Sequence, residues 1–236
     1  MPNLLAIETS SPLLSVAVKK GKGPVLEKNL EGFMKHGENL IPFIDQLLKK
    51  SRLKIGDIDF FLIGRGTGSF TGLRVGFATL KGFLAARRKP CLGALSLDVI
   101  AHGIDLPEGA RLCVCLDARR QKIYARIYER KKNAWKPEKK PRVLSVEELL
   151  GEFPAEIYLA GDGLARYGEE IKTKSGTRKI HFLPRSSWYP EASTLIRLFE
   201  ADLAIQTLAN PKDFLPLYFR LPEAEEKRRK HHAAAC

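Results

Sequence analysis

Two acidic residues stand where short apolar runs end. Glu8 closes the run Leu4–Ile7, and Asp117 closes the run Leu112–Leu116. A carboxylate at such a place can hold a metal ion bound to phosphate, or it can act as a general acid or base. It can also be a turn residue that hydrogen-bonds to its own backbone. The residues between and around these two acids decide which chemistry is available.

A glycine-rich loop joins the apolar run Phe60–Ile63 to a helix that should extend to about Arg87. Its alternating glycines permit positive φ, and Ser69 or Thr71 can cap the helix, so backbone amides gather at a helix N-terminus, which suits an anion. The loop lacks the Gly-Lys-Ser/Thr ending of a Walker loop and the glycines of a dinucleotide fingerprint. Anion binding and a purely structural turn both remain open. The candidate anion-binding residues are Gly66, Gly68, Ser69, Phe70 and Thr71.

The helix that follows carries glycine at interior positions. Gly76 and Gly82 each cost about 0.8–1 kcal/mol relative to alanine. A second helix packed closely along the small residues would offset this loss. Gly72 and Gly76 lie on one stripe, and Ala78, Gly82 and Ala86 lie on another. The neighbour is either an internal element or a helix of another subunit.

The composition is that of a basic globular protein. Forty Lys and Arg against 27 Asp and Glu give a net charge of +13, and 44% of the residues are hydrophobic. No apolar run reaches the roughly 18 residues of a membrane span, and the N-terminus lacks a signal-like pattern, so we expect a cytoplasmic protein without a membrane partner. Contact with nucleic acid and a solvated basic surface both fit the charge. The basic runs are 19–20, 87–89, 130–132, 136–142 and 227–230.

The cysteines and histidines form no metal-binding pattern. Cys113 and Cys115 fall on one face of an expected strand, where core packing is favoured over redox or metal chemistry. The five histidines include no His-Glu-x-x-His or His-x-x-x-His pair. We therefore expect no protein-held catalytic metal.

The elements that position the two acids occur in the same order in two halves of the chain. In the first half three strands precede alternating helices and strands, in the order βββαβαβα. After a Pro and Gly break at 106–109 the order recurs, with a third strand around Arg142–Leu144 and a last helix over Glu191–Thr207. We predict an α/β protein with lobes 1–105 and 106–222 and a charged, disordered tail 223–236.

This order is the topology of the ribonuclease-H-like fold. Its duplication is that of the actin, hexokinase and Hsp70 superfamily. In that superfamily the two acidic turns face a shared cleft and bind the metal-bound phosphates of a nucleotide. The fold alone does not establish the activity.

Longer motifs make the chain similar to one family, TsaB (YeaZ). The resemblance implies a bacterial protein that takes part in making threonylcarbamoyladenosine next to the anticodon of tRNA, with TsaD, TsaE and TsaC. TsaD is the metal-bearing catalytic paralogue, and TsaB is its non-catalytic assembly and activating partner. The motifs are Leu5-Ala6-Ile7-Glu8-Thr9-Ser10, Ser15–Val18, His36–Leu40, Gly64–Gly76, Leu116–Arg119 and Pro216–Arg220.

The resemblance also implies the binding surfaces. Pairing with TsaD as a heterodimer, and self-association as a homodimer, would use the same helices of the first lobe. Contact with tRNA, and with ATP or ADP, would occur only in the complex, with no tightly bound cofactor. The implied partner-binding residues are Gly72, Arg74, Val75, Gly76, Thr79, Leu80 and Phe83 on the central helix and Leu40, Phe43 and Ile44 on the flanking helix.

Three features agree with a lack of catalysis. The chain has no histidine pair at 95–100, where TsaD holds its metal, and Asp117-Ala118-Arg119 puts side chains where phosphate-binding members need glycine. At the third, adenosine-contacting position, Gly161-Asp162-Gly163 keeps two glycines but is an incomplete version of the motif. Glu8 stands where the family more often has Asp, and Thr67 where many members have Pro. We interpret Glu8 and Asp117 as inherited turn residues and expect no catalytic residue. The alternatives are an ATP-dependent phosphotransferase of the same superfamily and a metal-dependent nuclease or protease.

Overall fold

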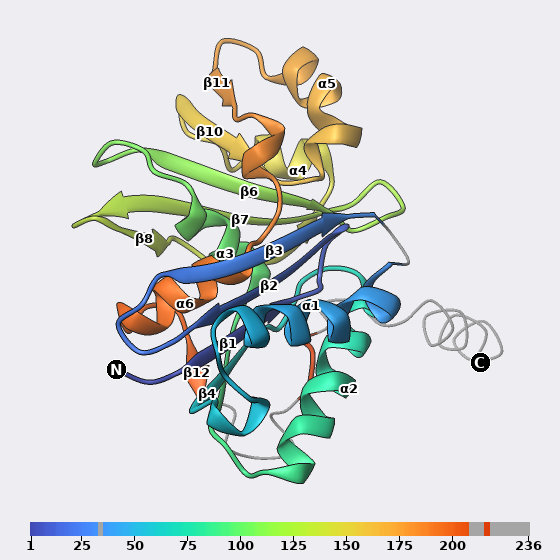
Figure 1. The fold of residues 1–236 in the computed structure, drawn as a ribbon. Helices are drawn as coiled ribbons and strands as arrows, with labels where there is room; N and C mark the ends of the chain where they lie inside the picture. The colour runs from blue at the N-terminus through green and yellow to red at the C-terminus, as the bar shows by residue number, and fades with distance from the viewer. Residues whose placement is uncertain (33–34, 208–214, 218–236) are drawn as a thin grey trace, which may run out of the picture.

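The computed structural model describes residues 1–32, 35–207 and 215–217. The predicted tail 223–236 and residues 218–220 of the last family motif lie outside these ranges. Two mixed sheets form the centre of the protein, one in each half of the sequence (Figure 1). The duplicated α/β architecture that the sequence predicts is therefore confirmed.

The first sheet has the strand order β12-β5-β4-β1-β2-β3. β1, β2 and β3 form the predicted antiparallel meander. β4 and β5 extend the sheet on the other side of β1 and run parallel to it. The bounds are β1 Leu4–Glu8, β2 Leu13–Lys19, β3 Val25–Glu31, β4 Phe60–Gly64, β5 Cys91–Ala94 and β12 Gln206–Thr207. The carboxyl ends of β1 and β4 consequently meet at one edge, where Glu8 and the glycine loop begin.

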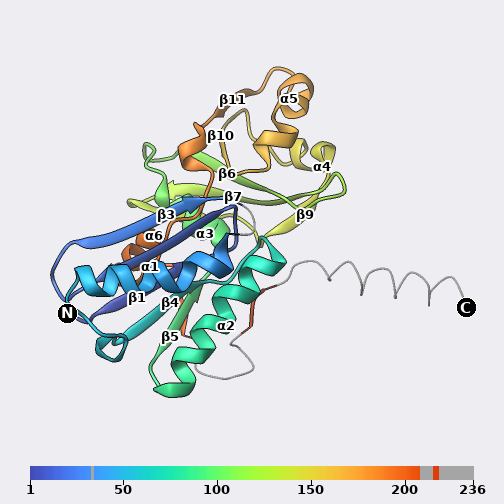
Figure 2. The same cartoon turned by 45° about the vertical axis from the view of Figure 1, so that its right-hand side comes forward.

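Helices cover both faces of this sheet. α1 (His36–Lys50) and α2 (Phe70–Ala86) lie side by side on one face, where Leu5 and Ile7 point (Figures 1 and 2). Because side chains alternate along a strand, Leu4 and Ala6 point to the other face, which α6 (Ala192–Glu200) covers. The short 3-10 helix η1 (Ile55–Asp57) precedes β4.

The second sheet has the order β11-β10-β6-β7-β8, with β9 also paired to β7. β6 and β7 are antiparallel, and β10 and β11 run parallel to β6. Cys113 and Cys115 lie in its core. The bounds are β6 Arg111–Asp117, β7 Ile123–Lys131, β8 Ala134–Pro137, β9 Arg142–Leu144, β10 Glu156–Ala160 and β11 Lys179–Phe182.

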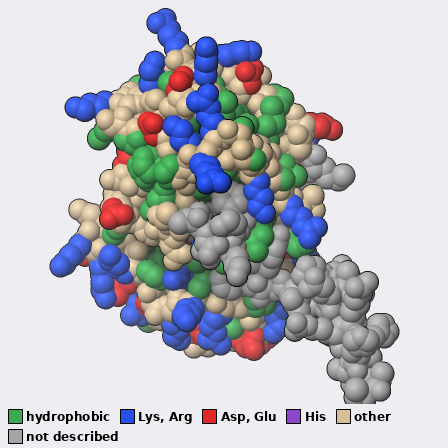
Figure 3. Space-filling model, turned by 90° about the horizontal axis from the view of Figure 1, so that it is seen from below, with side chains coloured by type: hydrophobic (Ala, Val, Ile, Leu, Met, Phe, Trp, Pro, Cys, Tyr) green, Lys and Arg blue, Asp and Glu red, His purple; other side chains and the backbone are tan. Residues whose placement is uncertain are grey.

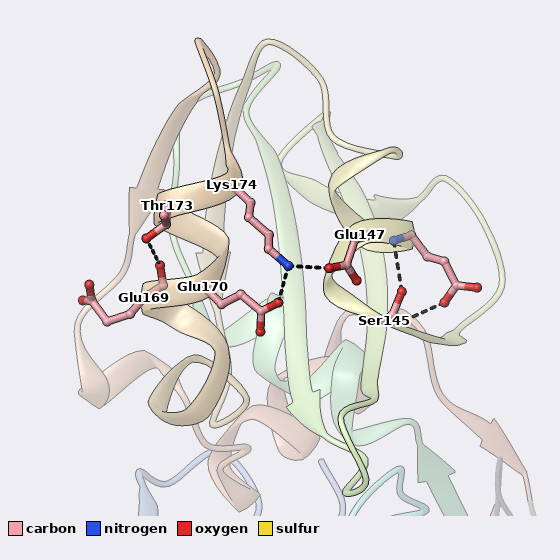
Figure 4. A network of polar contacts seen from close by, with 7 residues as sticks. Ser145, Glu147, Glu169, Glu170, Thr173 and Lys174 are labelled. Atoms are coloured by element: carbon pink, nitrogen blue, oxygen red, sulfur yellow. Dashed lines mark hydrogen bonds and ion pairs between the residues drawn. The ribbon is translucent and has the colours of Figure 1, made fainter.

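Two helices cover the outer side of this second sheet, α4 (Val146–Leu150) and α5 (Leu164–Lys174). Lys174 on α5 forms ion pairs with Glu147 on α4 and with Glu170 one turn earlier (Figure 4). Ser145 caps α4 through the amide of Glu148. These exposed contacts tie the two helices together, although each surface ion pair contributes less than about 1 kcal/mol.

The last helix of each half packs against the sheet of the other half. α3 (Ser96–Gly103) buries Leu97 and Ile100 against β6, β7 and β8. α6 buries Leu195 against β1, β2 and β4. Residues assigned by sequence to lobe 106–222 thus return to the first sheet, and β12 pairs with β5 at its edge.

Two local predictions differ from the structure. The helix predicted over Glu191–Thr207 ends at Glu200, because Asp202 and Ala204 adopt positive φ, which a right-handed helix excludes. The third strand of the second half is two short strands, β8 and β9, of which only β9 was predicted. No helix in the described part of the chain has the length and apolar character needed to span a membrane.

Candidate functional site

Glu8 lies at the carboxyl end of β1 and is fully buried. The amide of Ser10 donates to Glu8 Oε1 at 2.8 Å, and Ser96 Oγ donates to Oε2 at 3.1 Å. A Cβ on Gly64 would lie 1.8 Å from Glu8 Oε2, so the carboxylate fills the space over that glycine. Burial raises the pKa of Glu8, and these hydrogen bonds lower it only in part. Both carboxylate oxygens are therefore engaged inside the protein.

The turn after β1 is closed by the start of α2. The amide of Ser69 donates to the carbonyl oxygen of Ser10 at 2.6 Å. A Cβ on Gly72 would meet the carbonyl oxygen of Thr9 at 2.1 Å, and one on Gly76 would meet Thr9 Oγ1 at 2.5 Å. In the superfamily that the sequence led us to expect, an acidic turn would face a nucleotide. Here the corresponding backbone is covered by a helix of the same chain.

This contact gives Gly72 and Gly76 a close neighbour inside the chain. Both are buried and face Thr9, which is the internal one of the two neighbours that the sequence left open. Leu80 on α2 also belongs to the core. The glycines offset their unfavourable helix propensity by letting the helix approach the β1–β2 turn.

Part of the predicted set of amide donors at the start of α2 already donates to acceptors inside the protein. Ser69 caps α2, since its Oγ accepts the amide of Gly72 at 3.2 Å, and its own amide is used by Ser10. Gly66 and Gly68 have positive φ, as expected for a strand-to-helix turn. Ser69, Phe70 and the exposed Thr71 line a cleft. Anion binding by this loop stays a prediction.

The cleft lies between the two halves and has a volume of about 640 Å³. The first half contributes Ser10–Pro12 and Gly68–Thr71, and the second half contributes residues around Asp117, Asp162 and Arg166. Glu8 does not line it. Of the two acidic turns that the sequence led us to expect at a shared cleft, Asp117 lines it and Glu8 does not.

Asp117 is held by groups of its own lobe. The amide of Arg119 donates to Asp117 Oδ1 at 2.8 Å, and Tyr167 Oη donates to the same atom at 3.2 Å. The guanidinium groups of Arg119 and Arg166 lie 3.5 and 3.9 Å from Oδ2. The turn that follows, 119–121, has three successive non-glycine residues with positive φ. Side chains thus stand where phosphate-binding turns use glycine, as the sequence indicated.

Asp162 is an acid of this cleft that the sequence assigned no role. Its Oδ1 accepts the amide of Asp117 at 3.2 Å. Burial raises the pKa of Asp162 to about 6, and the negative charge of Asp117 acts in the same direction. In the sequence, the Gly161-Asp162-Gly163 motif was the only sign that Asp162 could belong to a site. Its glycines indicate the shape of the backbone and do not show that the acid is buried.

The predicted partner-binding residues of α1 and α2 are divided between the core and the surface. Leu40, Phe43 and Ile44 belong to the core, with exposed fractions of 1%, 6% and 3%, because they form the inner stripe of α1. The structure leaves Arg74 exposed and Val75, Thr79 and Phe83 half-buried. Exposed positions that the sequence analysis did not assign to this surface are Ile41, Ala78 and Gly82.

Ile41 is 49% exposed, and a Cβ added at Gly82 would have no neighbouring atom within 4 Å. The helical period itself carried part of the missing signal, since positions 78 and 82 lie opposite the buried stripe of α2 and position 41 lies at the edge of the buried stripe of α1. Within the described ranges, no group of three His, Cys, Asp or Glu side chains is arranged to hold a metal ion.

Comparison with known proteins gives the family. A family model described as TsaD, tRNA N6-adenosine threonylcarbamoyltransferase, matches residues 32–225. The tRNA threonylcarbamoyladenosine biosynthesis protein TsaB of Escherichia coli (strain K12) is 30% identical over 165 residues, covering 68% of this chain and 71% of that protein. The TsaB protein of Haemophilus influenzae is 27% identical, covering 92% and 93%.

A solved structure extends the similarity to nearly the whole fold. An uncharacterized Pseudomonas aeruginosa protein with similarity to peptidase YEAZ superposes with a TM-score of 0.77 at 26% identity, covering 93% of this chain and 100% of that one. The similarity thus covers nearly all of both halves of the chain. The chain belongs to the TsaB (YeaZ) family of tRNA threonylcarbamoyladenosine biosynthesis proteins.

Proposed function

We propose that this protein is a non-catalytic subunit that assembles with a TsaD-type transferase and activates it in tRNA threonylcarbamoyladenosine biosynthesis. One observation carries the proposal: the carboxylate of Glu8 is buried against Gly64 and bonded to Ser10 and Ser96. An acid with both oxygens engaged in the core is not available to a substrate. Glu8 and Asp117 then act as inherited turn residues.

The ATP-dependent phosphotransferase is not favoured. A phosphate at the second turn would meet Arg119 and Arg120 in a backbone of positive φ, where kinases of this fold use glycine to bring phosphate to the backbone. At the first turn, α2 already contacts Thr9 and Ser10. ATP or ADP would therefore bind only in the complex.

The docking surface in this proposal is the outer face of α1 and α2. It combines the large exposed Ile41 with small exposed residues of α2, Ala78 and Gly82, that permit close approach of another helix. Arg74, Val75, Thr79 and Phe83 complete it. The same face would serve a heterodimer with the transferase and a homodimer, with TsaE joining the assembled pair in the cytoplasm.

The experiment measures co-elution of the purified chain with a TsaD protein, and threonylcarbamoyl transfer to tRNA by the mixture. Ile41→Glu and Ala78→Arg should each abolish co-elution and lower transfer, because they place charge or bulk on the docking face. Phe182→Glu is the matched control, since Phe182 is 40% exposed on the second sheet. It should leave both readouts unchanged.

Gly76→Leu is not a clean test of docking, because its side chain would collide with Thr9 inside the chain. Equal co-elution of Ile41→Glu and the unmodified chain would refute the docking face. Robust ATP turnover or threonylcarbamoyl transfer by the isolated chain would refute the non-catalytic role.

A further inference from the structure

Eight basic residues gather at the end of the first sheet where β1, β4 and β5 begin. They come from three separate connections: the β2–β3 turn, the segment between α1 and β4, and the segment between α2 and β5. Seven are exposed, and Lys89 is half-buried. We call them the basic end: Lys20, Lys22, Lys50, Arg52, Lys54, Arg87, Arg88 and Lys89.

Asn3 joins two of these connections. Its Oδ1 accepts the amide of Gly21 in the β2–β3 turn at 3.1 Å, and its Nδ2 donates to the carbonyl oxygen of Asp57 in η1 at 2.9 Å. Lys20 Nζ donates to the carbonyl oxygen of Arg52 at 3.4 Å, across the same junction. The first two groups of cations are therefore neighbours.

The third connection joins them through Arg87. Its guanidinium carbon lies 3.1 Å from where a Cβ on Gly56 would stand, so the side chain rests on η1. The carbonyl oxygen of Pro90 accepts the amide of Phe61 at the start of β4, which fixes the segment beside the sheet. The three connections that carry the eight cations thus lie next to one another at this end of the sheet. Figure 3 views the molecule from below, where Lys and Arg side chains lie along the outline together with some Asp and Glu side chains.

Ion pairing separates the basic end from several basic residues of the second half of the chain. In the second half of the chain, basic residues such as Arg130, Arg142 and Lys174 each lie within 4 Å of a carboxylate. Among the described residues, no carboxylate lies that close to a cation of the basic end. The nearby Asp57 and Asp59 instead accept the backbone amides of Lys54 and Asn3.

Helix capping accounts for only part of this charge. Lys50 and Arg87 stand at the C-termini of α1 and α2, where a cation complements the helix dipole. Lys20, Lys22 and Lys54 lie in turns and have no such role. A row of unneutralised cations on several connections suits a partner with regularly repeated negative charge, and arginine in particular suits phosphate.

We propose that the basic end binds the phosphate backbone of the tRNA that the family modifies. This inference rests on the proposed function, which supplies RNA as the polyanion. The basic end lies beyond the C-terminal ends of α1 and α2, and the docking face lies along their outer sides. RNA and a protein partner can therefore occupy adjoining surfaces at the same time.

The experiment measures binding of an unmodified tRNA transcript to the full chain, alone and mixed with a TsaD protein, by fluorescence anisotropy at several salt concentrations. The test variant, K22E/K54E/R88E, takes one exposed cation from each connection. The control variant, K132E/K140E/K172E, takes three exposed lysines of the second half. Each substitution of a basic residue by Glu lowers the net charge by two, so both variants fall from +13 to +7. The two variants therefore differ only in where on the protein the substitutions lie.

The test variant should bind tRNA about tenfold or more weakly than the control variant, and its plot of log affinity against log salt should be shallower by about two to three, since each phosphate contact contributes about 0.7–0.9 to the slope. Equal weakening in the two variants would overturn the proposal. So would loss of binding to phosphatidylserine vesicles with tRNA binding unchanged, because the partner would then be a membrane.

Co-elution with the TsaD protein separates this inference from the proposed function. Both triple variants should co-elute normally, because none of their residues lies on the docking face. Unchanged tRNA binding by K22E/K54E/R88E with normal co-elution refutes the basic end alone. Failure of the unmodified chain to pair with TsaD refutes the proposed function, whatever the RNA result.

Discussion

The carboxylate of Glu8 and the backbone of Gly64 share one small volume, which leaves no room for a side chain at position 64. Gly64→Ala should destabilise the protein by at least about 2 kcal/mol, since the carboxylate would have to leave its hydrogen bonds to Ser10 and Ser96. Urea unfolding followed by circular dichroism measures the change.

Gly82→Ala is the control, because a Cβ at Gly82 has open space around it on α2. It should stabilise the protein by about 0.5–1 kcal/mol, the usual gain in helix propensity. Equal stability of the two variants would contradict the account of Glu8.

Asp162 should give stability a pH dependence of defined sign. Burial raises its pKa from 3.8 to about 6. Between these two pH values the folded state holds a proton that the unfolded state has released. The stability that protonated Asp162 contributes is therefore fully present below pH 3.8 and is lost as the pH rises through about 6. Asp162→Asn keeps an oxygen for the amide of Asp117 and should remove this slope.

At pH 7 the Asp162→Asn variant should be more stable than the unmodified chain by about 1–3 kcal/mol, with partial exposure lowering the gain. Unfolding in urea at several pH values between about 4 and 7 measures it. The exposed Glu169→Gln on α5 is the control and should leave the pH profile unchanged. An unaltered slope in Asp162→Asn would show that the acid is ionised throughout.

The sequence located both acidic turns but could not tell their environments apart. Glu8 and Asp117 each end an apolar strand, and each was found there. Their exposure depends on residues distant in sequence, Gly64 and Ser96 for the first and Tyr167 and Arg166 for the second. Contacts of that kind follow from tertiary packing, which strand patterns do not contain.

At the level of elements, α2 shows what glycine spacing does and does not reveal. The spacing of Gly72 and Gly76 indicated a close neighbour, and a close neighbour exists, but it is the β1–β2 turn and not a second helix. The order of strands and helices was predictable because hydrophobic periodicity is local. The face of α2 that turns toward the core was not, since both faces carry small residues.

α3 is anchored to the second sheet by a buried acid that the sequence did not single out. Asp98 Oδ1 accepts both Arg126 Nη1 and Tyr128 Oη at 2.7 Å. Asp98→Ala should destabilise the protein by about 3–5 kcal/mol, because it leaves a largely buried guanidinium without its carboxylate. Thermal and urea unfolding measure the loss.

Asp105→Ala is the matched control for Asp98→Ala. Asp105 pairs with Arg130 at 3.2 Å, but its side chain is 93% exposed. Its removal should change stability by less than about 1 kcal/mol. Similar losses in the two variants would show that burial does not determine the strength of the α3 anchor.

For the molecule as a whole, the important feature is the exchange of helices between the halves. The boundary at 105/106 was placed where the repeat begins again. The strands before it form the first sheet and those after it form the second, except for β12, which pairs in the first sheet. The repeat in the sequence does not predict that α6 covers β1, β2 and β4, because the apolar stripe of an amphipathic helix does not specify which sheet it packs against. Each sheet depends on the other half for one of its covering helices.

The isolated fragment 1–105 should therefore fail to form a fixed core. Without α6, the face that holds Leu4, Ala6 and Leu62 is open to water. We expect strong binding of the dye ANS and a poorly dispersed amide NMR spectrum from the fragment. Co-expression with fragment 106–236 should restore the dispersed spectrum of the full chain. A dispersed spectrum from fragment 1–105 alone would contradict this dependence.

The closure of the first turn also limits how the chain can change over generations. A shorter acid at position 8 would leave a void over Gly64, while Ser69 would still hold Ser10 and α2 would still rest on Thr9. The closure is therefore shared by residues of β1, β4 and α2, and a substitution at any one of them leaves the other contacts in place. Opening this turn to a ligand would take coordinated changes at several positions.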